Sequence, residues 1–139
     1  MSQSQILIVD DDSSLREAIC DTLMLAGYAC VEAGSGEEAL QILSRRVADM
    51  VITDVQMDGM DGHKLLNSIH EKYPSVPVLL MTAYANINGA VAAMRDGAVD
   101  YLSKPFAPEV LLNQVSRYVP VKYVVKGEPV WKDPSTGEL

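Results

Sequence analysis

The sequence predicts an α/β fold with a doubly wound, five-stranded parallel sheet and helices on both faces. Short β-branched and apolar runs, typical of buried strands, alternate five times with segments of helical periodicity, which favours a parallel sheet. With 139 residues the chain has the size of one domain with one core. Apolar residues make up 48% of it and charged residues 22%, which indicates a globular chain rather than a disordered one.

The first two strand–helix units follow from apolar runs and helix signals. Residues 6–9 end in acids and are typical of a fully buried strand. A capping box at residues 14–17 predicts the start of the first helix, and Gly27 is its expected stop. Residues 28–33 are expected to form the second strand, and another capping box at 35–38 predicts a second helix.

Three further units complete the pattern. The expected strands are 50–53, 76–81 and 98–102, and the helices expected after them are 61–73, 86–95 and 108–118. Asn88 and Gly89 lower the helix propensity of their segment, whereas Pro108 suits the first turn of the last helix.

The composition changes after residue 119, where prolines and glycines break any periodicity. We therefore expect one domain at 1–119 and a tail at 120–139 that links to an output domain outside this chain or is of artificial origin. An alternative is that the apolar residues at 121–125 and 130–131 dock onto a partner or add a strand to a dimer.

Charge and hydropathy argue against several classes of partner. The net charge is −8, and the tail holds three acids and three bases, so the whole excess lies in residues 1–119. Such an acidic domain repels phosphates, and we expect no direct contact with nucleic acid. The apolar runs are too short to span a membrane and no secretory signal is visible, so we expect no membrane partner and a cytoplasmic location. Cys20 and Cys30 match no redox or zinc motif and are expected to be small buried thiols.

Polar residues directly follow four of the expected strands, at the edge where folds of this class place their functional crevice. They are Asp10, Asp11 and Asp12 after the first strand, Asp54 after the third, Thr82 after the fourth and Lys104 after the fifth. Crowded carboxylates repel one another, and a hard divalent cation such as Mg²⁺ relieves that repulsion. A carboxylate beside such a cation can attack phosphorus and form an acyl phosphate, whose oxygens a lysine and a hydroxyl can neutralise. The pattern therefore predicts phosphoryl acceptance by Asp54, assisted by Thr82 and Lys104.

Asp12 and Lys104 each have a local feature that bears on their role. Asp12 could act only as a helix N-cap, so we expect two of the three acids after the first strand to bind the metal. Lys104 precedes Pro105, and a cis peptide bond there would aim the lysine side chain.

Five motifs stand at the expected strand ends. They are Ile-Leu-Ile-Val-Asp10-Asp11-Asp12, Val-Ile-Thr-Asp54, Gly59-Met60-Asp61-Gly62, Leu-Leu-Met-Thr82-Ala83 and Gly97-Ala98-Val99-Asp100-Tyr101-Leu102-Ser103-Lys104-Pro105-Phe106. Together, at these spacings, they resemble the receiver domain of a bacterial two-component response regulator over residues 5–119. The resemblance implies the flavodoxin-like receiver fold and a function in phosphorelay signal transduction.

The resemblance also implies how the acceptor and the metal are held. Asp54 would receive its phosphoryl group from a phosphohistidine on a sensor histidine kinase. Asp11 would ligate Mg²⁺ (or Mn²⁺) directly, and Asp10 would support the ion or bind it through water. The backbone carbonyl of Gln56 would be a further ligand, at a position that in the family also tunes phosphate loss. A shift of one residue, toward Asp12, stays open.

Three residues would respond to the phosphoryl group, and two others would modify the metal site or the lifetime of that group. Thr82 would swing to bond the phosphoryl group, Tyr101 would rotate inward in concert, and Lys104 would pair with a phosphoryl oxygen. Asp58 stands where the family often has proline, and adds negative charge near the metal. Bulky Tyr84, two residues past the threonine, would shield the phosphoryl group from water.

The motifs after the fourth and fifth strands most resemble those of nitrogen-regulation-type (NtrC-like) enhancer-binding transcriptional activators, including flagellar ones. This implies an ATPase domain and a DNA-binding domain in the full-length protein. The chain itself has no Walker-type loop, so we expect no enzyme beyond catalysis of its own phosphotransfer and dephosphorylation. Such receivers often pair through the fourth and fifth helices, so a homodimer stays open. The residues that fit a core or an interface equally well are Val91, Met94, Ala98 and Val110.

Other functions fit less well. A calcium loop that starts at Asp54 would need glutamate at its twelfth position, where Leu65 stands. A flavin phosphate would be repelled by the three aspartates after the first strand. Two alternatives remain open. One is a phosphohydrolase with an aspartyl nucleophile, although Gln56 replaces the second acid expected of such an enzyme. The other is a receiver that signals without phosphorylation, although such receivers usually lack an acid, the threonine or the lysine.

Overall fold

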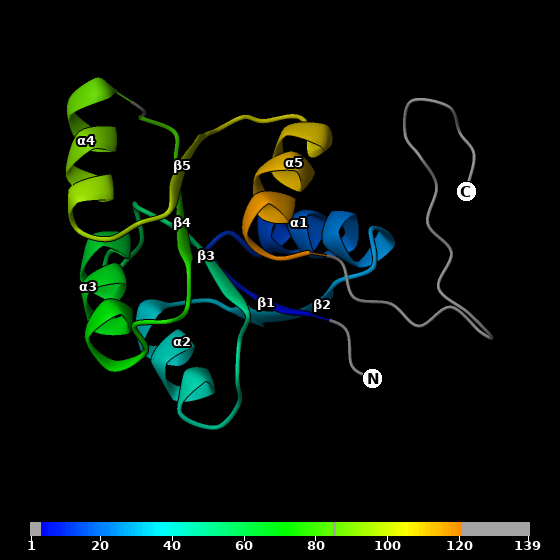
Figure 1. The fold of residues 1–139 in the computed structure, drawn as a ribbon, viewed down its shortest axis with the longest axis horizontal. Coiled ribbons are helices and arrows are strands. Elements are labelled where there is room, and N and C mark those ends of the chain that lie inside the picture. The colour runs from blue at the N-terminus through cyan, green and yellow to red at the C-terminus, as the bar shows by residue number, and fades with distance from the viewer. Residues whose placement is uncertain (1–3, 85, 121–139) are drawn as a thin grey trace.

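The computed structural model describes residues 4–84 and 86–120, and within them five parallel strands form one sheet in the order β2-β1-β3-β4-β5 (Figure 1). The strands are β1 (Gln5–Val9), β2 (Ala29–Ala33), β3 (Met50–Asp54), β4 (Val78–Thr82) and β5 (Asp100–Ser103). The helices are α1 (Ser13–Leu25), α2 (Gly36–Leu43), α3 (Gly62–Lys72), α4 (Ile87–Arg95) and α5 (Pro108–Tyr118). The predicted order of elements is confirmed.

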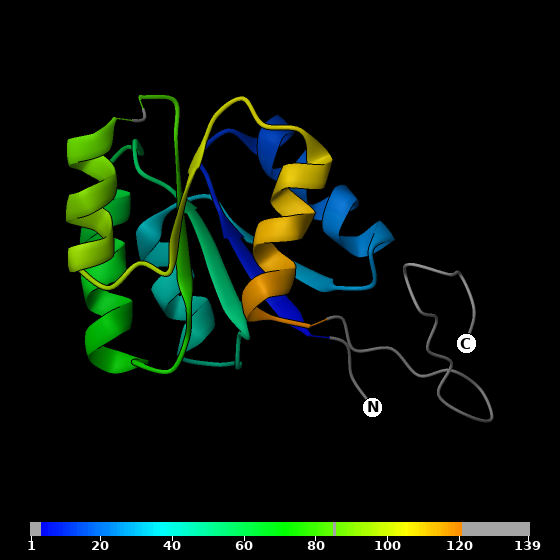
Figure 2. The ribbon, with the colours of Figure 1, turned by 45° about the horizontal axis from the view of Figure 1, so that its top comes forward.

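Helices cover both faces of the sheet. Helices α1 and α5 lie on one face, and α2, α3 and α4 lie on the other, in both views of the molecule (Figures 1 and 2). All the strands run parallel, but the direction in which strands are added to the sheet reverses at β1, because β2 pairs with one edge of β1 and β3 with the other, so the sheet is doubly wound. The carboxyl ends of β1 and β3 therefore flank a crevice at the switch point.

Two apolar layers hold the helices to the sheet. Successive residues of a strand point to opposite faces, so Leu7 and Val51 pack in one cluster with Ile69 of α3. The next residue, Ile8, packs in the other cluster with Leu111 of α5. Every residue of β3 and β4 is buried, as expected for strands covered on both sides. The core thus fixes the two strands whose ends carry Asp54 and Thr82.

The start of α1 differs from the prediction. The capping box at residues 14–17 is wrong, because the N-cap is Asp12 and the helix begins at Ser13. The Asp12 carboxylate accepts the backbone N–H groups of Ser14 and Leu15, at 3.1 and 3.2 Å. A carboxylate also interacts favourably with the helix dipole, which the uncharged hydroxyl of Ser14 does not match. The expected stop is confirmed: Gly27 has φ +104°, just past the C-cap of α1.

Two strands begin two residues later than predicted. Strand β4 starts at Val78 because Pro77 has no N–H to donate to the sheet. Strand β5 starts at Asp100 rather than at residue 98, because the N–H of Ala98 still bonds the carbonyl of Ala93 at the end of α4. Helix α5 has the predicted bounds.

The structure also bears on the predictions for the cysteines, the core or interface residues, membrane spans and the tail. Cys20 is buried as expected, whereas Cys30 is only partly buried. Of the residues assigned to core or interface, Ala98 is buried, and Val91, Met94 and Val110 are exposed by 43–50%. None of the helices in the described ranges is long and apolar enough to cross a membrane. The tail prediction for residues 120–139 falls almost wholly outside those ranges.

Candidate phosphoacceptor and metal site

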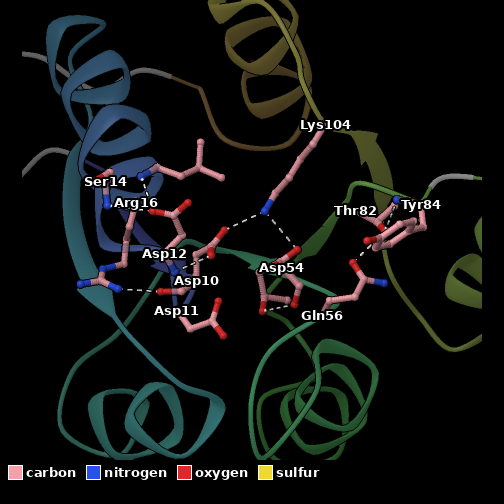
Figure 3. A network of polar contacts seen from close by, with 12 residues as sticks. Asp10, Asp11, Asp12, Ser14, Arg16, Asp54, Gln56, Thr82, Tyr84 and Lys104 are labelled. Carbon is pink, nitrogen blue, oxygen red and sulfur yellow. Dashed lines mark hydrogen bonds and ion pairs between the residues drawn. The ribbon is translucent and has the colours of Figure 1, made fainter.

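The carboxyl edge of the sheet gathers the polar residues that the sequence singles out (Figure 3). Asp10 follows β1 directly, Asp54 ends β3, Thr82 ends β4 and Lys104 follows β5. Asp10, Asp54 and Thr82 are exposed by only 0%, 5% and 1%, respectively. Buried polar side chains need partners, so the contacts among these residues define the site.

Lys104 joins the two buried carboxylates. Its Nζ atom lies 3.0 Å from Oδ2 of Asp10 and 3.2 Å from Oδ1 of Asp54. Burial alone lowers the pKa of the Lys104 ammonium, but the hydrogen bond to Asp10 and the charges of Asp10 and Asp54 raise it overall. The ammonium therefore stays charged. The Lys104–Pro105 peptide bond is cis.

The surroundings of Asp54 disfavour its ionised form. Burial, and after it the charge of Asp10, raises the pKa of the Asp54 carboxyl, and Lys104 offsets part of that rise. Its Oδ1 atom is buried and makes no hydrogen bond in the described part of the chain, since the Lys104 contact is an ion pair without hydrogen-bond geometry. A buried oxygen without a hydrogen bond is costly, which makes this atom available to a ligand.

Three carboxylates converge at this point. Asp10, Asp11 and Asp54 each offer one oxygen, and the three oxygens lie within 4.8 Å of one another. An all-oxygen set of this size suits a hard divalent cation, and the unbonded oxygen of Asp54 is consistent with that use. The donor set therefore fits Mg²⁺ or Mn²⁺.

Asp11 and Asp12 have different surroundings. Asp11 is exposed, and its Oδ2 accepts the N–H of Asp58 at 3.3 Å, which ties the loop after β1 to the loop after β3. Asp12 is occupied as the cap of α1 and lies outside the three-carboxylate cluster. An open cleft of about 410 Å³ adjoins the cluster, and its lining residues are Asp11, Val55, Gln56, Met57, Asp58 and Asp61.

Thr82 has both hydrogen-bonding roles filled. Its hydroxyl donates to Oε1 of Gln56 at 3.1 Å and accepts the N–H of Tyr84 at 3.0 Å (Figure 3). The Tyr84 side chain itself is 73% exposed. Tyr101 lies beside the first turn of α4, where a Cβ placed on Gly89 would be 3.0 Å from the tyrosine hydroxyl. The shielding expected of Tyr84 and the rotation expected of Tyr101 stay predictions.

Sequence reasoning missed two supports of the site. The Arg16 guanidinium donates to the backbone carbonyl of Asp10 at 2.6 Å and pairs with Glu32 at 2.9 Å, so it anchors the end of β1. Gly62, at the start of α3, lies so close to the backbone carbonyl of Asp54 that a Cβ would overlap it. The spacing of Arg16 gives no signal, whereas Gly62 was noted in a motif without a role.

A family model described as the response regulator receiver domain matches residues 6–116. The response regulator protein FleR of Pseudomonas aeruginosa is 52% identical over 115 residues, which are 83% of this chain and 24% of FleR. The DNA-binding transcriptional regulator NtrC of Klebsiella pneumoniae is 41% identical over 112 residues, 81% of this chain and 24% of NtrC. The chain thus spans about a quarter of the length of these relatives.

Solved structures of receiver proteins are also similar to this chain. The chemotaxis protein CheY4 of Vibrio cholerae, crystallised at low pH, superposes with a TM-score of 0.80 at 32% identity, covering 84% of this chain and 98% of that one. The receiver domain of NtrX from Brucella abortus superposes with a TM-score of 0.78 at 32% identity, covering 81% and 96%.

Proposed function

Because the chain belongs to the response regulator receiver domain family of two-component signal transduction, we propose that Asp54 is its phosphoacceptor and a sensor histidine kinase its donor. The observation that carries this proposal is the Asp54 carboxylate itself. It ends β3 inside a three-carboxylate cluster, with a buried oxygen that makes no hydrogen bond to residues 4–84 or 86–120 and a lysine ammonium 3.2 Å away. A nucleophilic oxygen with neutralising charge beside it is what phosphoryl acceptance requires.

The transfer itself makes one bond and breaks one. An oxygen of Asp54 attacks the phosphorus, and the bond from phosphorus to the phosphohistidine nitrogen breaks, which leaves an acyl phosphate on the protein. Lys104 neutralises one phosphoryl oxygen from its present place between Asp10 and Asp54. Asp10 and Asp11, with Asp54 and the backbone carbonyl of Gln56, would hold Mg²⁺ or Mn²⁺, and the bound ion would neutralise the remaining oxygens.

The same residues would convert the new group into a change of shape. The Thr82 hydroxyl, at the end of β4, would turn toward the phosphoryl group, and Tyr101 would follow from its place beside Gly89 of α4. The chain would thus act as a regulatory switch that catalyses only its own phosphotransfer and dephosphorylation.

The relatives support a role in transcription. NtrC is named a DNA-binding transcriptional regulator, and it is about four times as long as the segment that matches this chain. We extend the proposal accordingly: residues 1–119 form the receiver of a cytoplasmic transcription activator, and residues 120–139 lead toward its ATPase and DNA-binding domains. A homodimer through α4 and α5 belongs to this proposal as one of the states such a receiver adopts.

The acceptor residue can be located chemically. The protein is incubated with acetyl phosphate and Mg²⁺ and then treated with borohydride, which reduces an aspartyl phosphate to homoserine. Peptide mass mapping is expected to find homoserine at position 54 alone. Homoserine at Asp10, Asp11 or Asp12 instead, or at no position, would contradict the proposal.

A further inference from the structure

The hydroxyl of Thr82 is already committed in this structure. It carries a single hydrogen, and that hydrogen is donated to Oε1 of Gln56 at 3.1 Å. Its oxygen accepts the N–H of Tyr84 at 3.0 Å. Figure 3 shows the Gln56 amide reaching from the end of β3 to the end of β4. A hydroxyl with one hydrogen cannot donate to Gln56 and to a phosphoryl oxygen at the same time.

We propose that the Gln56 side chain is a latch that holds Thr82 away from Asp54 and must release it before Thr82 can bond the phosphoryl group. This inference rests on the proposed function, because it assumes that Thr82 serves a phosphoryl group on Asp54. It assigns the Gln56 side chain a positioning role, separate from any metal contact of its backbone carbonyl.

Burial explains why such a latch is useful. Thr82 is 1% exposed, so its donor would be left unsatisfied without Gln56, and a buried unsatisfied donor is costly. Gln56 is exposed, so its amide regains hydrogen bonds with water when it lets go. Release therefore costs mainly the Thr82 hydrogen bond, and the phosphoryl group offsets that cost by offering Thr82 a charged acceptor, which forms a stronger hydrogen bond.

The latch also links the acceptor strand to the β4–α4 loop. Gln56 lies two residues past Asp54, and Tyr84 bonds the same hydroxyl from the start of that loop. When Thr82 turns, the bond from the Tyr84 N–H must turn with it or break. The backbone amide of Tyr84 is consequently a reporter of the latch that requires neither metal nor phosphate.

The test is a double-mutant cycle between Gln56 and Thr82. Gln56→Met keeps the length of the side chain and removes the acceptor, and Thr82→Val removes the hydroxyl and keeps the shape. Beryllofluoride, a stable phosphoryl mimic, is titrated in Mg²⁺ into the wild type, both single variants and the double variant. The Tyr84 amide resonance is followed by NMR in all four proteins before any addition.

The latch predicts that Gln56→Met tightens beryllofluoride binding by about 2- to 10-fold, the range expected for one net hydrogen bond. It predicts no gain in the Thr82→Val background, and a shift of the Tyr84 amide in Gln56→Met that is absent when valine is already at position 82. An unchanged or weaker affinity of Gln56→Met, or an equal gain in both backgrounds, would overturn the latch. Failure of the wild type itself to bind beryllofluoride would instead overturn the proposed function.

Discussion

The Nζ atom of Lys104 lies 3.2 Å from Oδ1 of Asp54, yet that oxygen makes no hydrogen bond in the described part of the chain. The ammonium is directed instead at Asp10, to which it donates at 3.0 Å. Lys104 thus offsets part of the repulsion between two buried carboxylates, while it leaves an oxygen of the acceptor without a hydrogen bond in the described residues. The lysine thus reduces the charge repulsion that opposes folding, and the Asp54 oxygen keeps its capacity to bind a ligand.

Removal of this cation should destabilise the protein most when no divalent ion is present. In Lys104→Met, Asp10 and Asp54 face each other without a cation, and the free energy of unfolding should fall by about 1–3 kcal/mol in EDTA. Mg²⁺ should restore a large part of the loss, because it would replace the missing charge. Urea unfolding with and without Mg²⁺ measures both values, and Lys64→Met, at an exposed position of α3, is the matched control. Equal losses for the two variants would contradict the role of Lys104.

Asp54→Asn should stabilise the folded protein in the absence of metal. Burial and the charge of Asp10 raise the pKa of Asp54 in the fold, so its contribution to stability is present at low pH and is lost as the pH rises through the folded pKa. At neutral pH the ionised side chain therefore costs stability, and its removal should raise the free energy of unfolding. Urea unfolding in EDTA at pH 7 tests this, with exposed Asp96→Asn as control. Near pH 3 the gain should vanish, and a gain that persists there would refute the explanation.

Substitution of Asp12 should affect mainly stability, whereas substitution of Asp11 should affect mainly Mg²⁺ affinity. Asp12→Ala removes the N-cap of α1 and should lower stability by about 1 kcal/mol while Mg²⁺ affinity changes little. Asp11→Ala should do the reverse, since Asp11 belongs to the three-carboxylate cluster. Thermal unfolding and a Mg²⁺ titration on each variant provide the comparison, and Asp12→Asn, which keeps a capping oxygen, should behave as wild type. A large loss of Mg²⁺ affinity in Asp12→Ala would shift the metal site by one residue.

Gly62→Ala should destabilise the protein although alanine is the better helix former. Helix propensity alone would favour alanine by about 1 kcal/mol. At this position, however, the new Cβ would overlap the backbone carbonyl of Asp54, so the loop after β3 must move. We expect a net loss of about 2 kcal/mol or more in urea unfolding, together with slower phosphorylation. Gly34→Ala, whose Cβ would meet only side-chain atoms at 3.5 Å and beyond, is the control and should lose much less.

Much of this architecture could be predicted because it depends on local pattern. Apolar runs and helix signals give the order of the ten elements, and the rule that parallel strands end at one edge brings Asp10, Asp54, Thr82 and Lys104 together. The start of α1 could not be predicted with certainty, because Asp12 and Ser14 are both good caps and only the fold selects between them.

Side-chain geometry marks the limit of sequence reasoning. The sequence places Gln56 two residues past Asp54, but the bond from Thr82 to its amide depends on where β3 and β4 end in space. The contact of Arg16 with the Asp10 carbonyl likewise joins a helix to a strand end and leaves no periodic signal. Such contacts depend on tertiary packing, which spacing along the chain does not encode.

The most direct test of phosphoryl acceptance at Asp54 is the intact mass of the protein after incubation with acetyl phosphate. The measurement is made with Mg²⁺, with EDTA, and with Asp54→Asn in Mg²⁺. We expect one added phosphoryl group in the wild type with Mg²⁺, and none in EDTA or in the variant. A phosphoryl adduct of equal yield on Asp54→Asn, or a folded wild type that gains neither phosphoryl mass nor beryllofluoride in Mg²⁺, would contradict the account.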